Sequence, residues 1–464
     1  MSPVTIEALW KEMQALNQEG LLYEKAMDYG KQYLRQVYNR DVAAKTESQN
    51  DLSIFRESLP ETVGDPFQII DTLHQVGSAG TVAQGGGRFF GLVNGGVIPT
   101  ALAARIIADT WDQNAVLYSV SPTNAVIEET CQDWLNQLFG LPQQTVAGFV
   151  SGTSMAIVCG LAAARWRLYK NIGLDINTEG LCGAPKLRIV AAKHTHSTVF
   201  KAIALLGFGT QNIELVNVDV QGRLVPDDLP QLDDKTIVIL QAGNVNSGAF
   251  DPIRQVCEIA NKSGSWVHID GAFGLWAAAS APLSHLTDGI DLANSWSVDG
   301  HKTLNTPYDN GISLCADPEA MIQALQNSAD YIMYSDKRDG MLFTPEMSRR
   351  ARAIDLWATI KYLGRIGIDR MINGFHERAQ QFAKELKSAG FVVVNDVVFN
   401  QVMIQIGNQV ETDNFVTAVQ NSGKAWVGGS SWFGQPVVRI SVCSWATTSK
   451  DVTASVETFV AALK

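Results

Sequence analysis

Short apolar runs alternate with helical segments along the middle of the chain, from about residue 115 to residue 316. The runs are rich in aliphatic and β-branched residues: TVAGFV, LRIVAA, IELVNV, TIVILQA, SWVHID and GISLCA. Apolar strands separated by helices are typical of βαβ units, in which helices cover both faces of a parallel sheet. The pattern therefore predicts an α/β fold with an open, doubly wound, mostly parallel sheet.

The N-terminal part of the chain has a different pattern. Residues 5–47 carry apolar side chains at helical spacing, with a break at residues 17–20, and predict two helices. Such a pair cannot hold itself together and needs a partner surface. Glycines then gather at residues 78–96 and predict a loop-rich crossing into the main body.

Beyond Asp317 the pattern predicts a helix, an irregular stretch near residues 329–345, and a long helix from Pro345 to Leu386. Three strand-like runs follow, FVVVNDV, FNQVMIQI and PVVRISVC, with helices between and after them. This arrangement predicts a smaller α+β domain at the C-terminal end.

The length of 464 residues is more than one hydrophobic core usually organises. We therefore expect an N-terminal helical segment over residues 1–80, a large domain over residues 81–330, and a small C-terminal domain over residues 331–464 with a mobile loop before it. The boundaries follow the changes in pattern described above.

Composition narrows the class of protein. An apolar fraction of 46% and a charged fraction of 18% are ordinary for a globular protein. The net charge of −11 argues against nucleic acid or an anionic membrane as the main partner. No apolar run reaches the roughly 18 residues of a membrane span, and the acidic, amphipathic N-terminus does not resemble a signal peptide. The six cysteines stand singly, which favours a reducing cytoplasm over a disulfide framework or a zinc site.

Polar, turn-forming residues follow four of these apolar runs and a fifth strand-like run, NSWSV. In an open parallel sheet, ligands bind beyond the carboxyl ends of the strands, so these loops are expected to face one crevice. The five loops begin with SGTSMA, KHTHSTVFKA, GNVNSGAFDP, DGAFG and DGHKTLN. Together they bring glycines, hydroxyls, amides, two histidines, an aspartate and a lysine to one place.

The loop SGTSMA opens a helix with Gly152, Thr153 and Ser154. Free backbone N–H groups, a small glycine and two hydroxyls at a helix N-terminus can hold a phosphate. The alternative is an ordinary helix cap, because serine and threonine cap most helices. The spacing of a Walker loop is absent.

Two histidines, His194 and His196, lie just past the next apolar run. A third histidine or cysteine ligand is not near them, so a metal site is not expected. One of the two is a candidate to stack on a ring, and the other is a candidate for a surface or supporting role.

Asp270 ends an apolar run, where a carboxylate is costly to bury unless it is paired or hydrogen-bonded. It either caps the following turn or pairs with a buried cation such as a protonated ring nitrogen. Ala272 is small enough for a flat ring to lie against it. Lys302 is either a surface lysine or an amine that forms a Schiff base with a carbonyl. Read together, these features describe the binding site of one cofactor, pyridoxal 5′-phosphate (PLP).

The sequence also resembles a known family, the group II PLP-dependent amino acid decarboxylases, which include the glutamate, aromatic amino acid and histidine decarboxylases. The resemblance covers most of the chain, and its motifs occur in the family's order. They are RFFG (88–91), SPTNAVIEE (121–129), SGTSMA, HSTVFKA (196–202), GAFDPI (248–253), HIDGAFG and GHK.

This resemblance implies a fold-type I architecture, with a large seven-stranded domain, a smaller C-terminal domain, and a homodimer in which the N-terminal helices pair. It also implies that PLP is the cofactor and that an L-amino acid loses its carboxylate as CO2, through an imine on Lys302 and a quinonoid, to leave an amine. The catalytic residues would be Lys302, His196 and Asp270. Carried over by position, the cofactor-binding residues would be Gly152, Thr153, Ser154, His196, Asp270, Ala272, His301 and Lys302.

The sequence departs from the family pattern in two places. Gly243-Asn244-Val245 replaces a Gly-Thr-Thr turn, so Asn246 is the candidate for the lost hydroxyl contact. The region 335–350 lacks the loop tyrosine that protonates the intermediate in many relatives, although Tyr331 and Tyr334 lie just upstream. Other PLP chemistry on the same scaffold therefore stays open: a decarboxylative aldehyde synthase, a carbon–carbon lyase or an aminotransferase. A catalytically silent homologue is a further alternative, against which the complete set of Lys302, Asp270 and His196 argues.

The identity of the substrate is open at this stage. Phe89, Phe90, Trp111 and Trp432 are candidates for an aromatic pocket, although large apolar side chains also build cores. Arg439, on a strand of the C-terminal part, is a candidate to meet a substrate carboxylate or to pair with an acid of the chain.

Overall fold

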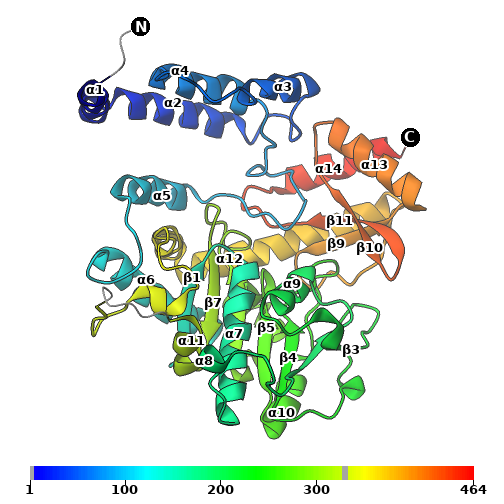
Figure 1. Ribbon diagram of the computed structural model, residues 1–464. Coiled ribbons are helices and arrows are strands. Elements are labelled where there is room, and N and C mark those ends of the chain that lie inside the picture. The colour runs from blue at the N-terminus through cyan, green and yellow to red at the C-terminus, as the bar shows by residue number, and fades with distance from the viewer. Residues whose placement is uncertain (1–4, 327–332, 464) are drawn as a thin grey trace.

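The computed structural model describes residues 5–326 and 333–463. Its largest feature is a seven-stranded sheet with the strand order β1-β7-β6-β5-β4-β2-β3 (Figure 1). The strands are β1 (Val146–Val150), β2 (Arg188–Ala192), β3 (Ile213–Val216), β4 (Thr236–Gln241), β5 (Trp266–Asp270), β6 (Ser295–Asp299) and β7 (Gly311–Cys315). Strand β7 runs antiparallel to its neighbours β1 and β6, whereas the pairs among β3, β2, β4, β5 and β6 are parallel. The mostly parallel sheet predicted from the apolar runs is confirmed.

Helices cover both faces of this sheet, which is why most positions of its central strands are buried and many are apolar. Successive side chains of a strand point to opposite faces, so Ile237 and Ile239 join one core while Val238 and Leu240 join the other. The first core includes side chains of α7 (Thr153–Asn171), α9 (Ser197–Leu205) and α11 (Pro318–Leu325). The second includes side chains of α6 (Pro122–Phe139) and α10 (Ile253–Ser263).

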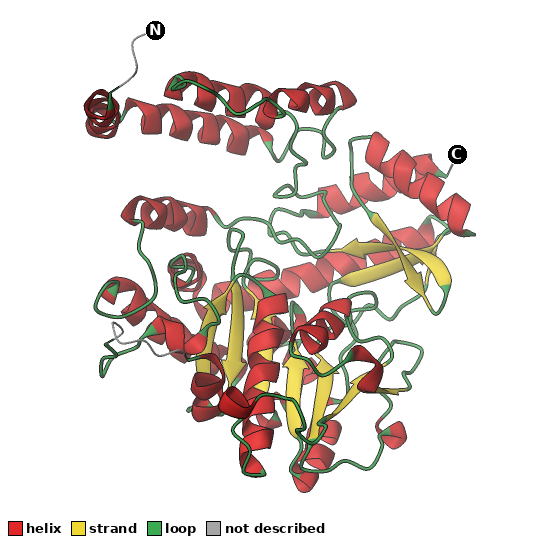
Figure 2. Cartoon of the chain, in the orientation of Figure 1, coloured by secondary structure: helices red, strands yellow, loops and turns green. Residues whose placement is uncertain are grey.

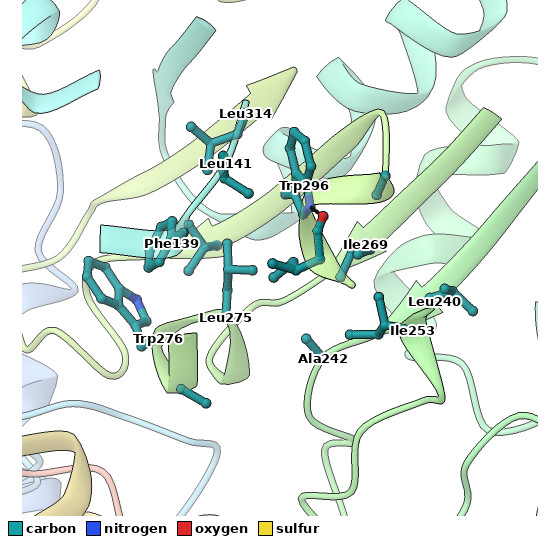
Figure 3. Close-up of a cluster of buried hydrophobic side chains, with 14 of the residues drawn as sticks. Phe139, Leu141, Leu240, Ala242, Ile253, Ile269, Leu275, Trp276, Trp296 and Leu314 are labelled. Atoms are coloured by element: carbon teal, nitrogen blue, oxygen red, sulfur yellow. Dashed lines mark hydrogen bonds between the residues drawn. The ribbon is translucent and has the colours of Figure 1, made fainter. Parts of the chain in front are cut away.

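Figure 3 shows the second core at close range, with Leu240, Ile269 and Trp296 from three neighbouring strands. Two buried tryptophans satisfy their indole N–H groups on backbone carbonyls, Trp296 on Ile290 O at 3.0 Å and Trp276 on Asp299 O at 2.9 Å. A buried N–H without an acceptor would cost about 1–3 kcal/mol, so these bonds fix the loops that they reach. One of those loops carries Asp299 at the carboxyl end of β6.

The C-terminal part contains a four-stranded antiparallel sheet in the order β10-β11-β9-β8. Its strands are β8 (Val392–Val393), β9 (Gln401–Gln405), β10 (Gly428–Trp432) and β11 (Gln435–Ser441). Two helices, α13 (Gln409–Asn421) and α14 (Ser449–Ala462), share a core with the sheet and with the second half of α12 (Ala353–Ser388). The expected α+β arrangement is present (Figure 2).

Three details differ from the sequence-based expectation. The long helix begins at Ala353 and not at Pro345, because Arg349 and Arg350 form ion pairs with Glu128 and Asp309 of other segments. The helix bends at Gly364, where φ is 57°. The run FVVVNDV forms strand only at Val392–Val393. Strand β10 was not expected, since GGSSW has almost no apolar residues.

The N-terminal helices form a layer apart from the body of the molecule (Figure 1). They are α1 (Ile6–Glu19), α2 (Leu21–Gln36), α3 (Thr46–Asp51) and α4 (Pro66–Thr72), followed later by α5 (Pro99–Trp111). The two helices expected within residues 5–47 are confirmed as α1 and α2. None of the residues of α1 to α4 is buried, and Trp10, Leu21 and Tyr23 are more than half exposed. This layer therefore has no core of its own.

Among residues 5–326 and 333–463, no helix combines the length and the apolar character that crossing a membrane requires.

Candidate active site

The carboxyl ends of β5 and β6 place two aspartates side by side in the sheet, because these strands are parallel neighbours. Asp270 is the last residue of β5 and pairs in register with Ser297 of β6, and Asp299 is the last residue of β6. Both are at most 5% exposed. The loops expected to face one crevice therefore meet around two buried carboxylates.

Lys302 lies in a turn that the rest of the molecule holds from several directions. The side-chain amide of Asn305 donates to Lys302 O at 2.9 Å, Thr303 O at 3.0 Å and Cys443 O at 2.8 Å. Its oxygen accepts from Gly96 N at 2.8 Å and Trp445 N at 2.9 Å. These bonds fix the backbone of the lysine turn against segments that are remote in sequence.

Gly95 and Gly96, which are remote in sequence, pack closely against the lysine turn and its surroundings. A Cβ atom on Gly95 would stand 2.2 Å from Lys302 O, and one on Gly96 would stand 2.6 Å from Ser444 Oγ. Only a residue without a side chain fits such positions. The end of the glycine-rich stretch at 78–96 thus packs against the lysine turn.

The Lys302 amine forms an ion pair inside the molecule. Its Nζ lies 2.9 Å from Asp299 Oδ2, and its side chain is 22% exposed. Burial lowers the pKa of Lys302, but the charges of Asp299 and Asp270 and the nearby Cys443 outweigh that effect and raise the pKa above its ordinary value. The lysine is therefore an ammonium in this structure, not a free surface lysine.

The N-terminus of α7 has the features of a phosphate cradle. Thr153 donates its backbone N–H to Asp299 Oδ1 at 2.7 Å. Its buried hydroxyl Oγ1 has no hydrogen-bond partner among the described residues. Ser154 is exposed at the same helix end. Gly152 keeps this end open, since a Cβ on it would stand 3.3 Å from His301 Cε1.

His196 caps α9, where its Nδ1 lies 2.7 Å from Thr198 Oγ1 and accepts from Thr198 N at 3.3 Å. Burial lowers the pKa of His196, and Lys302 and Arg439 lower it further against the opposing charge of Asp270. His196, Asp270, Lys302 and Arg439 thus lie within electrostatic range of one another, and the imidazole is neutral near pH 7.

Asp270 accepts a hydrogen bond from Ala272 N at 3.2 Å. Burial raises the pKa of Asp270, although His196, Lys302 and the Ala272 N–H oppose that effect. A buried carboxylate of this kind gains stability from a cation placed against it. Ala272 follows on the same turn and is half-buried.

His301 lies beside the cradle and is held by Tyr308 and Asn310, which follow it in the chain. Asn310 N donates to His301 Nδ1 at 3.0 Å, so the proton of the neutral ring is on Nε2, which lies 3.5 Å from Asp299 Oδ2. The Tyr308 ring stacks on the His301 ring with centroids 4.3 Å apart. Asp309 turns the other way, to Arg350 at 3.0 Å and Arg352 at 3.2 Å.

The remaining candidates are placed as follows. The Asn246 amide is engaged with β10, accepting from Ser430 Oγ at 2.8 Å and donating to Ser431 O at 3.4 Å. Phe90 is fully buried in the core of the C-terminal part, against Phe382. Phe89 stacks on Trp426 with centroids 4.7 Å apart. The structure thus assigns these three side chains other contacts.

Trp111 ends α5 and is 46% exposed. Trp432 packs against His194 with ring centroids 4.9 Å apart. Arg439, in contrast, lies near His196, and its Nη1 donates to Val245 O at 3.1 Å. Tyr334 is 41% exposed, and Tyr331 lies outside the described residues.

Sequence reasoning missed Asp299 and Asn305. Asp299 carries the same signal as Asp270, an acid at the end of an apolar strand, and stands three residues before Lys302. Asn305 carries no local signal, because its partners Gly96 and Cys443 are 209 and 138 residues away along the chain. Among the described residues, no group of three or more histidines, cysteines and acids is arranged to hold a metal ion.

These residues fit PLP. The orphan hydroxyl and the open helix end at Thr153 suit its phosphate, the buried Asp270 suits a protonated ring nitrogen, and the Lys302 amine suits its aldehyde. The fold and the site together define a PLP-dependent enzyme of fold-type I.

Comparison with known proteins gives the family. Residues 50–406 match the family described as the pyridoxal-dependent decarboxylase conserved domain, and the chain belongs to this family. The cofactor and the enzyme class expected from the sequence motifs, a PLP-dependent amino acid decarboxylase, are thereby confirmed at the level of the family.

Two relatives show how far the likeness extends. The chain is 28% identical over 330 residues to the acidic amino acid decarboxylase GADL1 of Mus musculus, which covers 68% of this chain and 59% of the relative. It is 29% identical over 337 residues to the cysteine sulfinic acid decarboxylase of Homo sapiens, covering 69% of this chain and 67% of the relative. The match thus spans less than two thirds of the first relative.

Solved structures share the fold. The apo form of mouse CSAD superposes with a TM-score of 0.88 at 22% identity, covering 96% of this chain and 98% of that one. A 4-hydroxyphenylacetaldehyde synthase of Rhodiola rosea superposes with a TM-score of 0.81 at 20% identity, covering 99% of both chains. The fold-type I architecture is confirmed, while the roles of individual site residues stay predictions.

Proposed function

We propose that this chain removes the α-carboxylate of an L-amino acid as CO2 and leaves an amine, with Lys302 as the covalent anchor of PLP. The observation that carries the proposal is the Lys302 ammonium, which is paired with Asp299 at the end of β6, and Asp299 in turn accepts from the first backbone N–H of α7. The match to the decarboxylase family supports the reaction type.

When bound, PLP supplies an electron-accepting pyridinium ring that stabilises the carbanion left by CO2. The residues of the chain set up that chemistry. Asp270 keeps a proton on a ring nitrogen placed against it, because a buried carboxylate favours a cation. His196 and Ala272 offer a neutral flat surface and a small one, between which an aromatic ring can lie.

Arg439 is the candidate for binding the substrate. No carboxylate pairs with its guanidinium in the part of the chain that the structure describes, and burial lowers its pKa. Arg439 is half-buried, and a partly buried cation without a counter-ion favours an anionic ligand. We assign it to a carboxylate of the amino acid substrate.

We further propose an acidic amino acid as the substrate. The relatives reported above are named for acidic amino acids and cysteine sulfinic acid. The aromatic side chains that favoured an aromatic substrate are engaged elsewhere, Phe90 in a core and Phe89 against Trp426.

A product assay tests the reaction and the substrate together. Full-length protein with PLP is incubated with cysteine sulfinate, aspartate, glutamate, tyrosine and tryptophan, and CO2, amine, keto acid, aldehyde and peroxide are measured. We expect CO2 and amine in equal amounts from an acidic substrate and none from Lys302→Ala. Keto acid without CO2 would point to an aminotransferase, and aldehyde with peroxide to an aldehyde synthase, the activity named for one structural neighbour.

We also propose a homodimer in the cytoplasm. A layer of helices α1 to α4 without buried residues gains a core when a second copy covers its exposed apolar side chains. The cysteines of the chain are free thiols, and five of the six are buried, which suits a reducing compartment.

A further inference from the structure

Asp299 is a buried charge to which the proposed function gives no role. Its side chain is 2% exposed, and it ends β6 three residues before Lys302. Burying a carboxylate is costly unless partners compensate it, so its contacts indicate what it does.

The two carboxylate oxygens of Asp299 reach two different parts of the site. Oδ1 accepts from the backbone N–H of Thr153, the first residue of α7, at 2.7 Å. Oδ2 lies 2.9 Å from Lys302 Nζ. One side chain therefore joins the candidate phosphate cradle to the candidate covalent anchor.

Two hydrogen bonds also fix the backbone of Asp299. Its N–H donates to Ala272 O at 2.9 Å, and its carbonyl accepts from Trp276 Nε1 at 2.9 Å. The carboxylate thus stands in a fixed position, and the flexible lysine side chain is the partner that can move.

We propose that Asp299 is a positioning residue for cofactor loading, which holds the Lys302 ammonium beside the cradle and sets the pH at which the neutral amine is released to react with the aldehyde. This inference rests on the proposed function, in which Lys302 anchors PLP. It gives the aspartate a task before the first turnover, distinct from that of Asp270.

The reaction balances as follows. Lys302 gives one proton to water, and the lone pair of Nζ then forms a bond to the aldehyde carbon. The carbonyl C–O bond breaks, and its oxygen leaves as water with the two protons that remain on Nζ. Asp299 stays a carboxylate throughout. No oxidant or reductant takes part.

Several charged or titratable groups face Lys302. Asp299 and Asp270 favour its charged form, as does the thiol of Cys443, whereas His196 and His301 are its histidine neighbours. Burial raises the pKa of Asp299, but Lys302, His301 and the Thr153 N–H outweigh it and bring the pKa below its ordinary value. Removing the Asp299 charge leaves Asp270 as the carboxylate that favours the ammonium.

The test compares wild-type protein with Asp299→Asn, in which an amide oxygen can still accept from Thr153. The full-length chain is freed of cofactor and pulse-labelled with acetic anhydride from pH 7 to pH 11.5, and the Lys302 peptide is quantified by mass spectrometry. An opposite charge this close raises a pKa by about 1–3 units, so we expect Lys302 of the variant to titrate at least about one unit lower. This change is about tenfold more neutral amine near pH 8.

The second readout is PLP capture, followed by the visible absorption of the linked cofactor in stopped flow. The pH at which capture is half-maximal should move down in Asp299→Asn, in the same direction as the Lys302 titration. Asp227→Asn, which removes an exposed carboxylate, is the matched control and should match wild type in both readouts.

An unchanged Lys302 titration or an unchanged capture profile in Asp299→Asn would overturn the proposal. Should that variant not fold, wild-type protein decides alone, since Lys302 titrating below the ordinary lysine value of about 10.4 contradicts the ion pair. A shifted Lys302 pKa with PLP attached to another lysine would refute the proposed anchor and leave the Asp299–Lys302 pair standing, so the two failures are distinguishable.

Discussion

At the scale of single residues, polar groups with incomplete partners are the most informative property of this molecule. Among the described residues, the half-buried Arg439 near His196 has no acidic partner, and the buried hydroxyl of Thr153 has no hydrogen-bond partner. Native structures rarely leave such groups unsatisfied, so each points to a ligand. The two groups point to different ligands, a carboxylate and a phosphate.

Arg439→Met should raise the KM for the substrate by about 30-fold or more, because losing one partner of a buried charge pair costs about 2–5 kcal/mol. Arg439→Lys keeps the charge and should restore part of the affinity. Arg378→Met, on helix α12 and not on the strand of Arg439, should leave KM unchanged. Steady-state kinetics check this, and an unaltered KM in Arg439→Met would reject the assignment.

Asp270→Asn should lower kcat by about 100-fold or more, the scale on which removing one preorganised group acts, because the ring nitrogen loses its counter-ion. PLP should still attach to Lys302, as its visible absorption will show. A variant with wild-type kcat would mean that Asp270 only caps its turn.

At the scale of elements, a buried ion cluster fixes the segment before α12 to helix α6. Glu128 on α6 pairs with Arg338 at 2.9 Å and Arg349 at 2.7 Å, and all three side chains are at most 4% exposed. Burial raises the pKa of Glu128, but the two arginines outweigh it and lower the pKa to about 2. The Glu128 carboxylate thus neutralises the charges of two buried arginines.

Glu128→Gln should reduce the free energy of unfolding at pH 7 by about 3–5 kcal/mol, because two guanidinium groups remain buried without an anion. The pKa of Glu128 is lower in the folded than in the unfolded protein. Its stabilisation is therefore complete above about pH 4.5 and is lost as the pH falls towards 2. Denaturant unfolding at several pH values measures both effects. The exposed neighbour Glu129→Gln is the control, and equal losses in the two variants would contradict the account.

The elements also show which parts of the fold the sequence can predict. Strands covered on both faces are mostly apolar, so β1, β2, β4 and β5 can be predicted from the pattern alone. Strand β10 has the sequence GGSSW and forms by pairing with β11. Its local sequence pattern does not predict a strand. The site divides likewise: Asp270 and Lys302 follow strands, whereas Asn305 acts through contacts across more than a hundred residues.

At the scale of the whole molecule, the N-terminal layer of helices α1 to α4 is the part that has no hydrophobic core. Its helices carry Trp10, Leu21 and Tyr23 on exposed faces and bury no residue. Isolated short helices are marginal in water, so this layer needs a second surface. A second copy of the chain would supply it by symmetry.

Sedimentation should therefore give a mass of twice the 50.4 kDa of one chain. The double variant Trp10→Glu/Leu21→Glu places charges on the exposed apolar face and should shift the protein towards the monomer. The control variant Lys11→Glu, next to Trp10 on α1, should remain dimeric. A monomeric wild-type protein, or a double variant of unchanged mass, would refute the proposed dimer surface.

The central claim is that Lys302 is the covalent anchor of PLP, and peptide mapping tests it most directly. The full-length protein is loaded with PLP, reduced with borohydride to make the linkage permanent, and digested for mass spectrometry. We predict a phosphopyridoxyl group on the peptide that contains Lys302, and no such group at any site in Lys302→Ala. Attachment to another lysine, or none in a protein that is folded, would contradict the account.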